Sequence, residues 1–128
     1  MAKTRVLVVE DSLTVRKRML EVLAADPDIE IVGQADDGKR GIELCQHLRP
    51  DVVTLDMMLP VMSGLAATEF IMDYCPTPIL IVSAGALDVL DKPLGNEPDD
   101  RQIQKTIKEN DSFVHWEVGY NQTDLSGR

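Results

Sequence analysis

The sequence has few aromatic residues, few cysteines and no long hydrophobic run. Aromatic residues make up 4% of its 128 residues, so any core has to be built mainly from aliphatic side chains. Two cysteines, Cys45 and Cys75, are too few for a disulfide scaffold and are typical of small apolar residues in a reducing compartment. The apolar runs fall far short of the ~18 residues that a membrane span needs, and the N-terminus does not resemble a secretory signal. These absences predict a cytoplasmic protein without a membrane partner.

Basic residues are also in short supply. The chain has 13 Lys and Arg against 22 Asp and Glu, which gives a net charge of −9. Phosphate backbones are bound by basic surfaces, so this balance argues against nucleic acid as the main partner, whereas a basic protein or a divalent cation stays compatible with it. No Gly-x-Gly-x-x-Gly motif follows the first apolar run, which excludes the common kind of dinucleotide-binding enzyme.

Short apolar runs alternate with amphipathic segments through the first two thirds of the chain. Strands are predicted at 6–9, 29–32, 51–55 and 79–82, and helices from Ser12 onward, from about 39 to 48 and from about 65 to 73. The 44% of hydrophobic residues can supply the core of one domain of this size. The alternation therefore predicts an α/β fold whose parallel sheet is covered on both faces.

The last third of the chain carries weaker signals. The pattern predicts a fifth strand at Ala86 to Leu90, a short helix at Arg101 to Glu109 with few apolar anchors, and a strand with period-two alternation at Phe113 to Tyr120. The regular domain is therefore expected to cover residues 1–93, and residues 94–128 are expected to form an atypical C-terminal segment.

The connection between the predicted fourth and fifth strands is unusually short. After Ser83, only Ala84 and Gly85 separate the two strands, whereas parallel neighbours need a crossover of about a dozen residues. We therefore expect one of two arrangements. Either a helical segment has been omitted, or the residues beyond Ser83 are exchanged between the subunits of a homodimer, with Phe113 to Tyr120 as a candidate extra strand.

Polar side chains follow several of the predicted strands at their carboxyl ends. Glu10 and Asp11 come after the first strand, Asp56 closes the third, Ser83 follows the fourth and Lys92 follows the fifth. Each alone would more often be a turn or surface residue, but working sites of parallel sheets lie at this edge. Clustered carboxylates favour a hard cation such as Mg²⁺. The set predicts phosphoryl transfer, with Asp56 as nucleophile and Ser83 and Lys92 binding phosphoryl oxygens.

Several motifs resemble the receiver domain of two-component response regulators. The similarity covers about residues 4 to 93 and rests on Val6-Leu-Val-Val-Glu-Asp-Ser12, Asp51-Val-Val-Thr-Leu-Asp-Met-Met-Leu-Pro60, Met62-Ser-Gly64 and Asp91-Lys-Pro93. Within that family the sequence most resembles the receiver half of the chemotaxis protein-glutamate methylesterase. The segments Glu69-Phe-Ile-Met72, Cys75-Pro-Thr-Pro-Ile-Leu-Ile-Val-Ser-Ala84 and Gly85-Ala-Leu-Asp-Val-Leu-Asp-Lys-Pro93 carry this closer likeness.

The resemblance implies a fold, a reaction and partners. It implies a flavodoxin-like, doubly wound sheet of order 2-1-3-4-5, and a phosphoryl group passed to Asp56 from a phosphohistidine on a sensor histidine kinase. Glu10, Asp11, Asp56 and the backbone carbonyl of Met58 would hold Mg²⁺. Ser83 would be the switch hydroxyl and Lys92 the lysine that pairs with the phosphate. An output domain or a partner protein would read the phosphorylated state.

The sequence departs from this family in ways that keep other functions open. The helix usual between the fourth and fifth strands is missing, and Val89 stands where receivers carry a switch aromatic. No Gly-x-Ser-x-Gly motif is present, so the methylesterase catalytic half is absent and the chain is expected not to be an enzyme. The alternatives are a regulatory fragment of such a methylesterase, or an engineered or deleted receiver that no longer switches. A Mg²⁺-dependent phosphatase is disfavoured, because Met58 occupies the position of its general acid.

Overall fold

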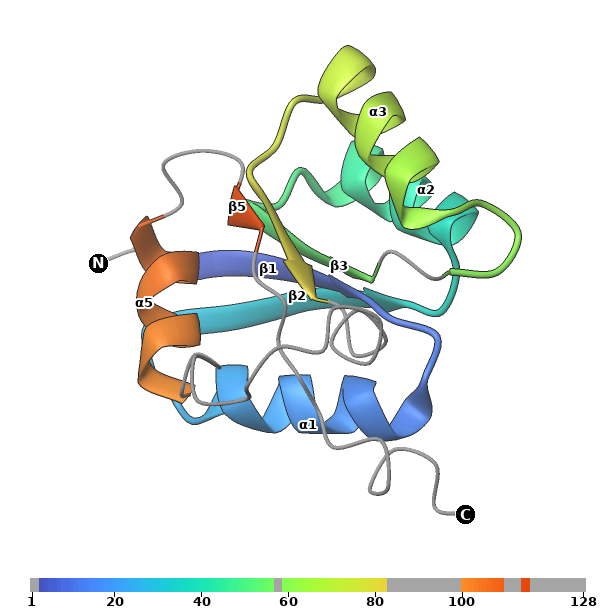
Figure 1. The fold of residues 1–128 in the computed structure, drawn as a ribbon. Coiled ribbons are helices and arrows are strands. Elements are labelled where there is room, and N and C mark those ends of the chain that lie inside the picture. Colours follow the sequence, from blue (N-terminus) through green and yellow to red (C-terminus); the bar gives the residue numbers. More distant parts are fainter. Residues whose placement is uncertain (1–2, 57–58, 83–99, 110–113, 116–128) are drawn as a thin grey trace.

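The computed structural model describes residues 3–56, 59–82, 100–109 and 114–115, which form a three-layer α/β structure. A parallel five-stranded sheet has the order β2-β1-β3-β4-β5 (Figure 1). The elements are β1 (Thr4–Val9), α1 (Leu13–Ala24), β2 (Ile29–Ala35), α2 (Gly38–Leu48), β3 (Val52–Asp56), α3 (Gly64–Tyr74), β4 (Ile79–Val82), α5 (Asp100–Glu109) and β5 (Val114–His115). The predicted α/β class is confirmed, and so is the flavodoxin-like order of the first four strands.

The strand β1 is buried on both faces from Val6 to Val9, as this apolar run predicts. Val6 and Val8 point into a cluster formed with α1 and α5, whereas Leu7 and Val9 point into a second cluster formed with α2 and α3. All four residues are at most 1% exposed. Alternate residues of a strand face opposite sides, so a strand covered by helices on both faces disfavours charged residues until it ends. The first polar residue after this run is Glu10, which places it at the edge of the sheet.

The fifth place in the sheet is taken by a segment from the end of the chain. Leu80 and Ile81 of β4 pair in parallel with Val114 and His115 of β5. The sequence predicts Ala86 to Leu90 at this place, but those residues lie outside the described part of the chain. Residues 83–113 separate β4 from β5 and include α5, so this crossover meets the length that parallel neighbours need. The strand signal at 113–120 is confirmed for two residues and pairs within the same chain.

The helix α5 packs on α1 and belongs to the same core as the strands. Its buried apolar residues are Ile103 and Ile107, the two anchors that the sequence contains. The side-chain amide of Gln104 donates a hydrogen bond to the carbonyl oxygen of Val22 at 2.8 Å. The ammonium of Lys108 lies 2.7 Å from a carboxylate oxygen of Asp26 in the turn after α1. These contacts attach α5 to the face of the sheet opposite α2 and α3.

The helices begin and end at residues that satisfy free backbone groups. Ser12, Asp37 and Ser63 each accept a hydrogen bond from the backbone near the start of α1, α2 and α3, respectively. α2 ends at Arg49, whose φ of 49° is left-handed. The guanidinium of Arg5 then donates to the carbonyl oxygens of Leu48 and Arg49, at 2.9 and 2.8 Å. The helix end predicted at about residue 48 is therefore confirmed.

The loop between β3 and α3 packs closely against the start of α2. A Cβ atom at Gly38 would collide with the carbonyl oxygen of Met62, so a glycine is required for this approach. In the same loop Val61 has a φ of 70° and is 79% exposed. A β-branched residue is unfavourable at positive φ, because its Cβ crowds the backbone. The loop next to the predicted site therefore stores strain at Val61.

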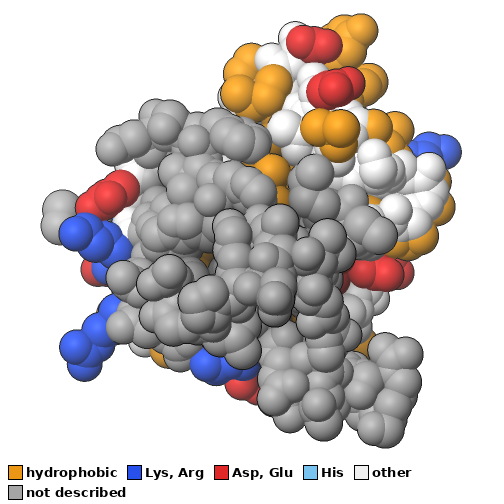
Figure 2. Space-filling view, in the orientation of Figure 1, with side chains coloured by type: hydrophobic (Ala, Val, Ile, Leu, Met, Phe, Trp, Pro, Cys, Tyr) orange, Lys and Arg blue, Asp and Glu red, His pale blue; other side chains and the backbone are white. Residues whose placement is uncertain are grey.

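The outer surface of α3 carries exposed apolar side chains. Ala67 and Ile71 are buried against α2 and the sheet, whereas Leu65, Met72 and Tyr74 remain exposed. Figure 2 shows hydrophobic side chains gathered over this helix. No helix in the described residues is both long and apolar enough to span a membrane.

The ion pair between Lys108 and Asp26 gives stability a pH dependence. Lys108 lowers the pKa of Asp26 below its usual 3.8, and Asp26 raises the pKa of Lys108 above its usual 10.5. The pair therefore stabilises the fold between these values. Its contribution is lost as the pH falls below 3.8 through the folded pKa of Asp26, and as the pH rises beyond 10.5 through that of Lys108.

We expect Lys108→Met to lower the melting temperature at pH 7 and to lower it less at pH 3, because below the usual pKa of 3.8 the unfolded chain binds a proton that the ion pair keeps off Asp26 in the folded protein. Thermal unfolding followed by circular dichroism at both pH values measures this. Lys105→Met is the matched control, because Lys105 lies on the same helix, is exposed, and among the described residues forms an ion pair with Glu109 at 3.8 Å. Equal losses in the two variants at pH 7 would contradict the assignment.

Val61→Gly should raise the free energy of unfolding by about 1 kcal/mol. Removing the Cβ at positive φ relieves ~1–2 kcal/mol of strain, offset in part by the greater freedom of glycine in the unfolded chain. Val61→Ala keeps the Cβ and should gain less. Urea denaturation of the three proteins compares them, and a Val61→Gly protein no more stable than wild type would show that the loop is unstrained.

Candidate functional site

Three carboxylates meet at the carboxyl end of the sheet. Glu10 directly follows β1, Asp11 is the next residue, and Asp56 is the last residue of β3. Val9 pairs with Leu55 across β1 and β3, which places Glu10 and Asp56 at the same level of the sheet. One carboxylate oxygen from each acidic residue lies within 4.8 Å of the other two. The structure thus brings together the acidic residues that the sequence predicts at this edge.

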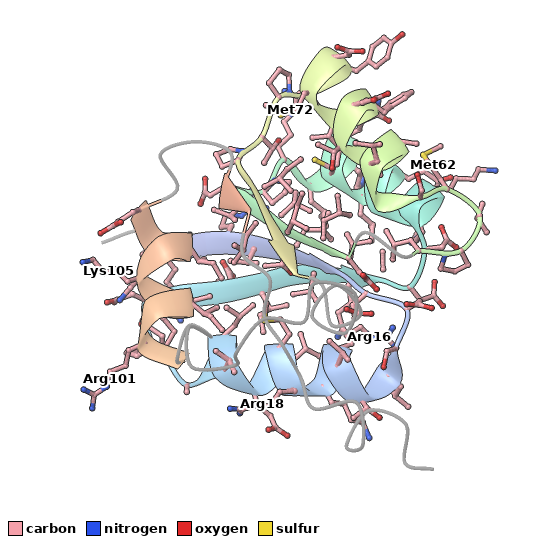
Figure 3. The ribbon with its side chains drawn as sticks, viewed as in Figure 1. Arg16, Arg18, Met62, Met72, Arg101 and Lys105 are labelled. Carbon is pink, nitrogen blue, oxygen red and sulfur yellow. The ribbon has the colours of Figure 1, made fainter. Side chains whose placement is uncertain are left out.

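The turn that carries Glu10 and Asp11 is held by the first turn of α1. Ser12 caps the helix by accepting a hydrogen bond from the N–H of Val15 at 3.3 Å, and its own N–H donates to Glu10 Oε2 at 3.1 Å. Arg16 Nη1 donates to the carbonyl oxygen of Glu10 at 2.7 Å. Figure 3 shows Arg16 on α1, near the end of the sheet where β1 stops. The helix therefore orients the acidic turn through both a side chain and the backbone of Glu10.

Arg16 is a residue of this site that no sequence motif predicts. Its backbone N–H donates to the carbonyl oxygen of Ser12 at 2.8 Å, as in any first helical turn. The sequence places Arg16 four residues after Ser12, which is about one helical turn. That spacing is ordinary for a surface arginine, so the contact with Glu10 becomes visible only in three dimensions.

Burial and neighbouring negative charge both act on Glu10. Glu10 is 6% exposed and Asp56 is 9% exposed, and apolar side chains of β1 and α1 line a small cavity beside Glu10. Burial is the largest effect, followed by the hydrogen bond with Asp56 and the repulsion from Asp56 and Asp11. Together they raise the pKa of Glu10 to about 9, although the N–H of Ser12 acts in the opposite direction. Without a cation, the closely spaced pair of Glu10 and Asp56 therefore favours sharing a proton over carrying two full negative charges.

The chemistry of this donor set fits a hard divalent cation. Carboxylate oxygens are the ligands that Mg²⁺ prefers. A bound cation would neutralise the negative charge of Asp11 and Asp56, whose repulsion raises the pKa of Glu10. Within the described ranges, Glu10, Asp11 and Asp56 are the one group of three or more such side chains that could hold a metal ion. Met58, Ser83, Val89 and Lys92 lie outside the described residues, so their predicted roles stay predictions.

Comparison with known proteins places the chain in a family. The model of the response regulator receiver domain matches residues 6–111. A protein-glutamate methylesterase/protein-glutamine glutaminase from Myxococcus xanthus is 44% identical over 124 residues, covering 81% of this chain and 35% of the relative. A second such protein, from Methanococcus maripaludis, is 41% identical over 126 residues, covering 85% and 34%. The chain spans about a third of the length of these curated relatives.

Solved structures agree with this placement. The response regulator domain of Thermotoga maritima CheB is similar with a TM-score of 0.66 and 29% identity, covering 98% of this chain and 87% of that chain. A signal receiver domain from Mycobacterium tuberculosis reaches a TM-score of 0.72 with 28% identity, covering 85% and 96%. The sheet order, the acidic cluster at its carboxyl edge and the matching sequence model lead to one conclusion. The chain belongs to the response regulator receiver domain family.

Proposed function

We propose that Asp56 accepts a phosphoryl group from a phosphohistidine of a sensor histidine kinase. The observation that carries this proposal is the position of Asp56, which ends β3 beside Glu10 and Asp11 with its oxygen within 4.8 Å of theirs. A carboxylate oxygen of Asp56 attacks phosphorus, and the bond from phosphorus to the imidazole nitrogen breaks. The electron pair returns to that nitrogen, which takes up a proton. The product is an acyl phosphate on Asp56, the signal of a two-component receiver.

Glu10, Asp11 and Asp56 would hold Mg²⁺, with the backbone carbonyl of Met58 as a further ligand. The bound cation supplies charge neutralisation for the phosphoryl oxygens. The chain contributes the geometry: Ser12 and Arg16 fix the turn that presents Glu10 and Asp11. Orientation of the acidic turn before the donor arrives limits the reorganisation needed for transfer.

Ser83 and Lys92 would bind the phosphoryl oxygens after transfer. Asp56 pairs with Val82 across β3 and β4, and Ser83 is the residue that follows Val82. This register supports a hydroxyl close to the acceptor. Lys92 would supply a positive charge, which an acyl phosphate among carboxylates requires. A partner protein or an output domain would then recognise the changed surface.

Asp56→Asn should abolish phosphoryl uptake, because an amide is too weak a nucleophile to form the acyl phosphate. Wild type and variant are incubated with acetyl phosphate and Mg²⁺, and intact mass spectrometry counts the phosphoryl groups. Asp36→Asn is the control, since Asp36 is exposed, follows β2 at the same edge and lies outside the carboxylate cluster. Uptake by Asp56→Asn equal to that of Asp36→Asn would refute the nucleophile.

Asp11→Ala should weaken Mg²⁺ binding at least about tenfold, which corresponds to about 1.4 kcal/mol, because one of three carboxylate ligands is lost. Isothermal titration calorimetry with MgCl₂ measures the affinity directly. Asp36→Ala should bind Mg²⁺ as wild type does. If Asp11→Ala and Asp36→Ala bind equally well, the cation does not sit in the carboxylate cluster.

A second candidate is that the chain is the regulatory part of a methylesterase. It is supported by relatives at 41% and 44% identity whose names carry that activity and of which this chain matches about a third. The test is to sequence the gene beyond the codon for Arg128. A continuous reading frame encoding a serine hydrolase domain supports this candidate, and a stop codon directly after Arg128 refutes it. The chemistry of Asp56 is the same in both cases.

A further inference from the structure

Two cysteines far apart in sequence lie together at the end of the domain opposite the carboxylate cluster. Cys45 is in α2 and Cys75 follows the last residue of α3, and their sulfur atoms are 3.9 Å apart. Both sulfurs are free thiols. Cys75 and Cys45 lie just before β4 and β3 in the chain, whereas Glu10 and Asp56 lie where strands end. A bond between the cysteines would therefore connect two helices away from the phosphoryl site.

We propose that Cys45 and Cys75 form a reversible intramolecular disulfide when the protein meets hydrogen peroxide or a related two-electron oxidant. The proposal concerns a modification site that is separate from the proposed phosphorylation of Asp56. It rests on the distance between the two sulfur atoms, on their unequal exposure and on the irregular backbone at Cys75.

The surroundings of the pair favour a bond between these two sulfurs over other products. Cys45 is 1% exposed and packs in the apolar cluster under α2 and α3, whereas Cys75 is only partly buried at its margin. The oxidant therefore reaches Cys75 first. The thiol in contact with Cys75 is that of Cys45. The Thr77 hydroxyl donates to the carbonyl oxygen of Cys75 at 2.7 Å and lies 3.6 Å from the sulfur of Cys45. Thr77 thus ties the backbone of Cys75 to the thiol of Cys45.

The backbone allows the sulfurs to approach. A disulfide has an S–S distance of about 2.05 Å, so the sulfurs have to come closer by about 1.9 Å. Cys75 has φ −146° and ψ 63°, outside the helical region, and is followed by Pro76 and Pro78. Its N–H still donates to the carbonyl oxygen of Ile71 at 2.9 Å. Closing the gap would take rotation of the two side chains and a shift at this helix end, where Cys75 has left the helical backbone.

The chemistry balances in two steps. The thiolate sulfur of Cys75 attacks one peroxide oxygen, the O–O bond breaks, and hydroxide leaves and takes up the proton released by the thiol to form water. Cys75 is now a sulfenic acid. The sulfur of Cys45 attacks the sulfur of Cys75, the S–O bond breaks, and hydroxide leaves with the thiol proton of Cys45 as a second water. Two thiols have lost two electrons in total, and peroxide has been reduced to two waters.

The bond would stabilise the fold, because it joins residues separated by 29 intervening positions (46–74) and so restricts the unfolded chain. The melting temperature of the oxidised protein should rise by several degrees above that of the reduced protein. Cys75→Ala, which removes the more exposed thiol, should show no rise after the same treatment.

The test treats the purified chain with hydrogen peroxide, removes the oxidant, and then unfolds the protein in guanidinium with N-ethylmaleimide. Intact mass spectrometry should find a monomer that lacks two hydrogen atoms and carries no maleimide, and prior reduction with dithiothreitol should restore two maleimide groups. Cys45→Ala and Cys75→Ala should each remain without the intramolecular bond. Two free thiols in oxidised wild type, a sulfinic acid on Cys75 with Cys45 free, or dimers linked between chains would each overturn the proposal.

A second measurement does not depend on how well the variants fold. Wild type is equilibrated in glutathione redox buffers with and without denaturing urea, and the oxidised fraction is determined by mass. The folded chain should give a ratio of disulfide to dithiol at least about tenfold higher than the unfolded chain, because the fold holds the sulfurs together. An equal or lower ratio in the folded chain would show that the native packing opposes the bond. Neither result depends on whether Asp56 accepts a phosphoryl group.

Discussion

The pairing of β1 with β3 is the constraint on which the site depends. Val9 lies opposite Leu55, so the next residue of each strand, Glu10 and Asp56, reaches the carboxyl edge at the same level. Residues 6–9 of β1 and 52–55 of β3 are buried because helices cover both faces of the sheet, and Thr54 is the one polar residue among them. A shift of either strand by one residue would bury a carboxylate in the core and separate the pair. The same register of β1 against β3 is therefore needed both for the packing of the core and for the position of the acidic cluster.

The acidic cluster is held in an electrostatically unfavourable state by the rest of the fold. Burial and the neighbouring carboxylates raise the pKa of Glu10 to about 9. Contacts from α1, including the Arg16 guanidinium on the carbonyl oxygen of Glu10, keep the turn in place despite this repulsion. Stability given up in this way is common at functional sites, because the same charge that destabilises the empty cluster attracts the ligand. The apolar core, in which Val6 to Val9 are at most 1% exposed, supplies the compensation.

The two ends of the domain differ in chemistry. The carboxyl ends of the strands carry negative oxygens and a strained loop at Val61, whereas the opposite end carries the thiols of Cys45 and Cys75 beside Thr77. Buried apolar clusters lie on both faces of the sheet between them, and α5 joins α1 through Ile107 and Lys108 on one face. Chemistry at one end can thus proceed without direct contact with the other, which is why a bond between the thiols and a phosphoryl group on Asp56 are separable events.

The sequence by itself determined the α/β class, the first four strands, the helices between them and the acidic residues at the strand ends. It could do so because apolar runs that stop at Glu10 or Asp56, and caps such as Ser12, act locally or through a simple rule of parallel sheets. Only the tertiary structure decided that Val114 and His115 pair with β4, that Arg16 contacts Glu10, and that the two cysteine sulfurs meet. Some of these contacts join segments that helix packing brings together, and others depend on the direction of a side chain. A local sequence pattern encodes neither the packing nor the direction. The alternation at Phe113 to Tyr120 predicts a strand, but its place beside β4 becomes identifiable only when the edge of the sheet that it completes is present.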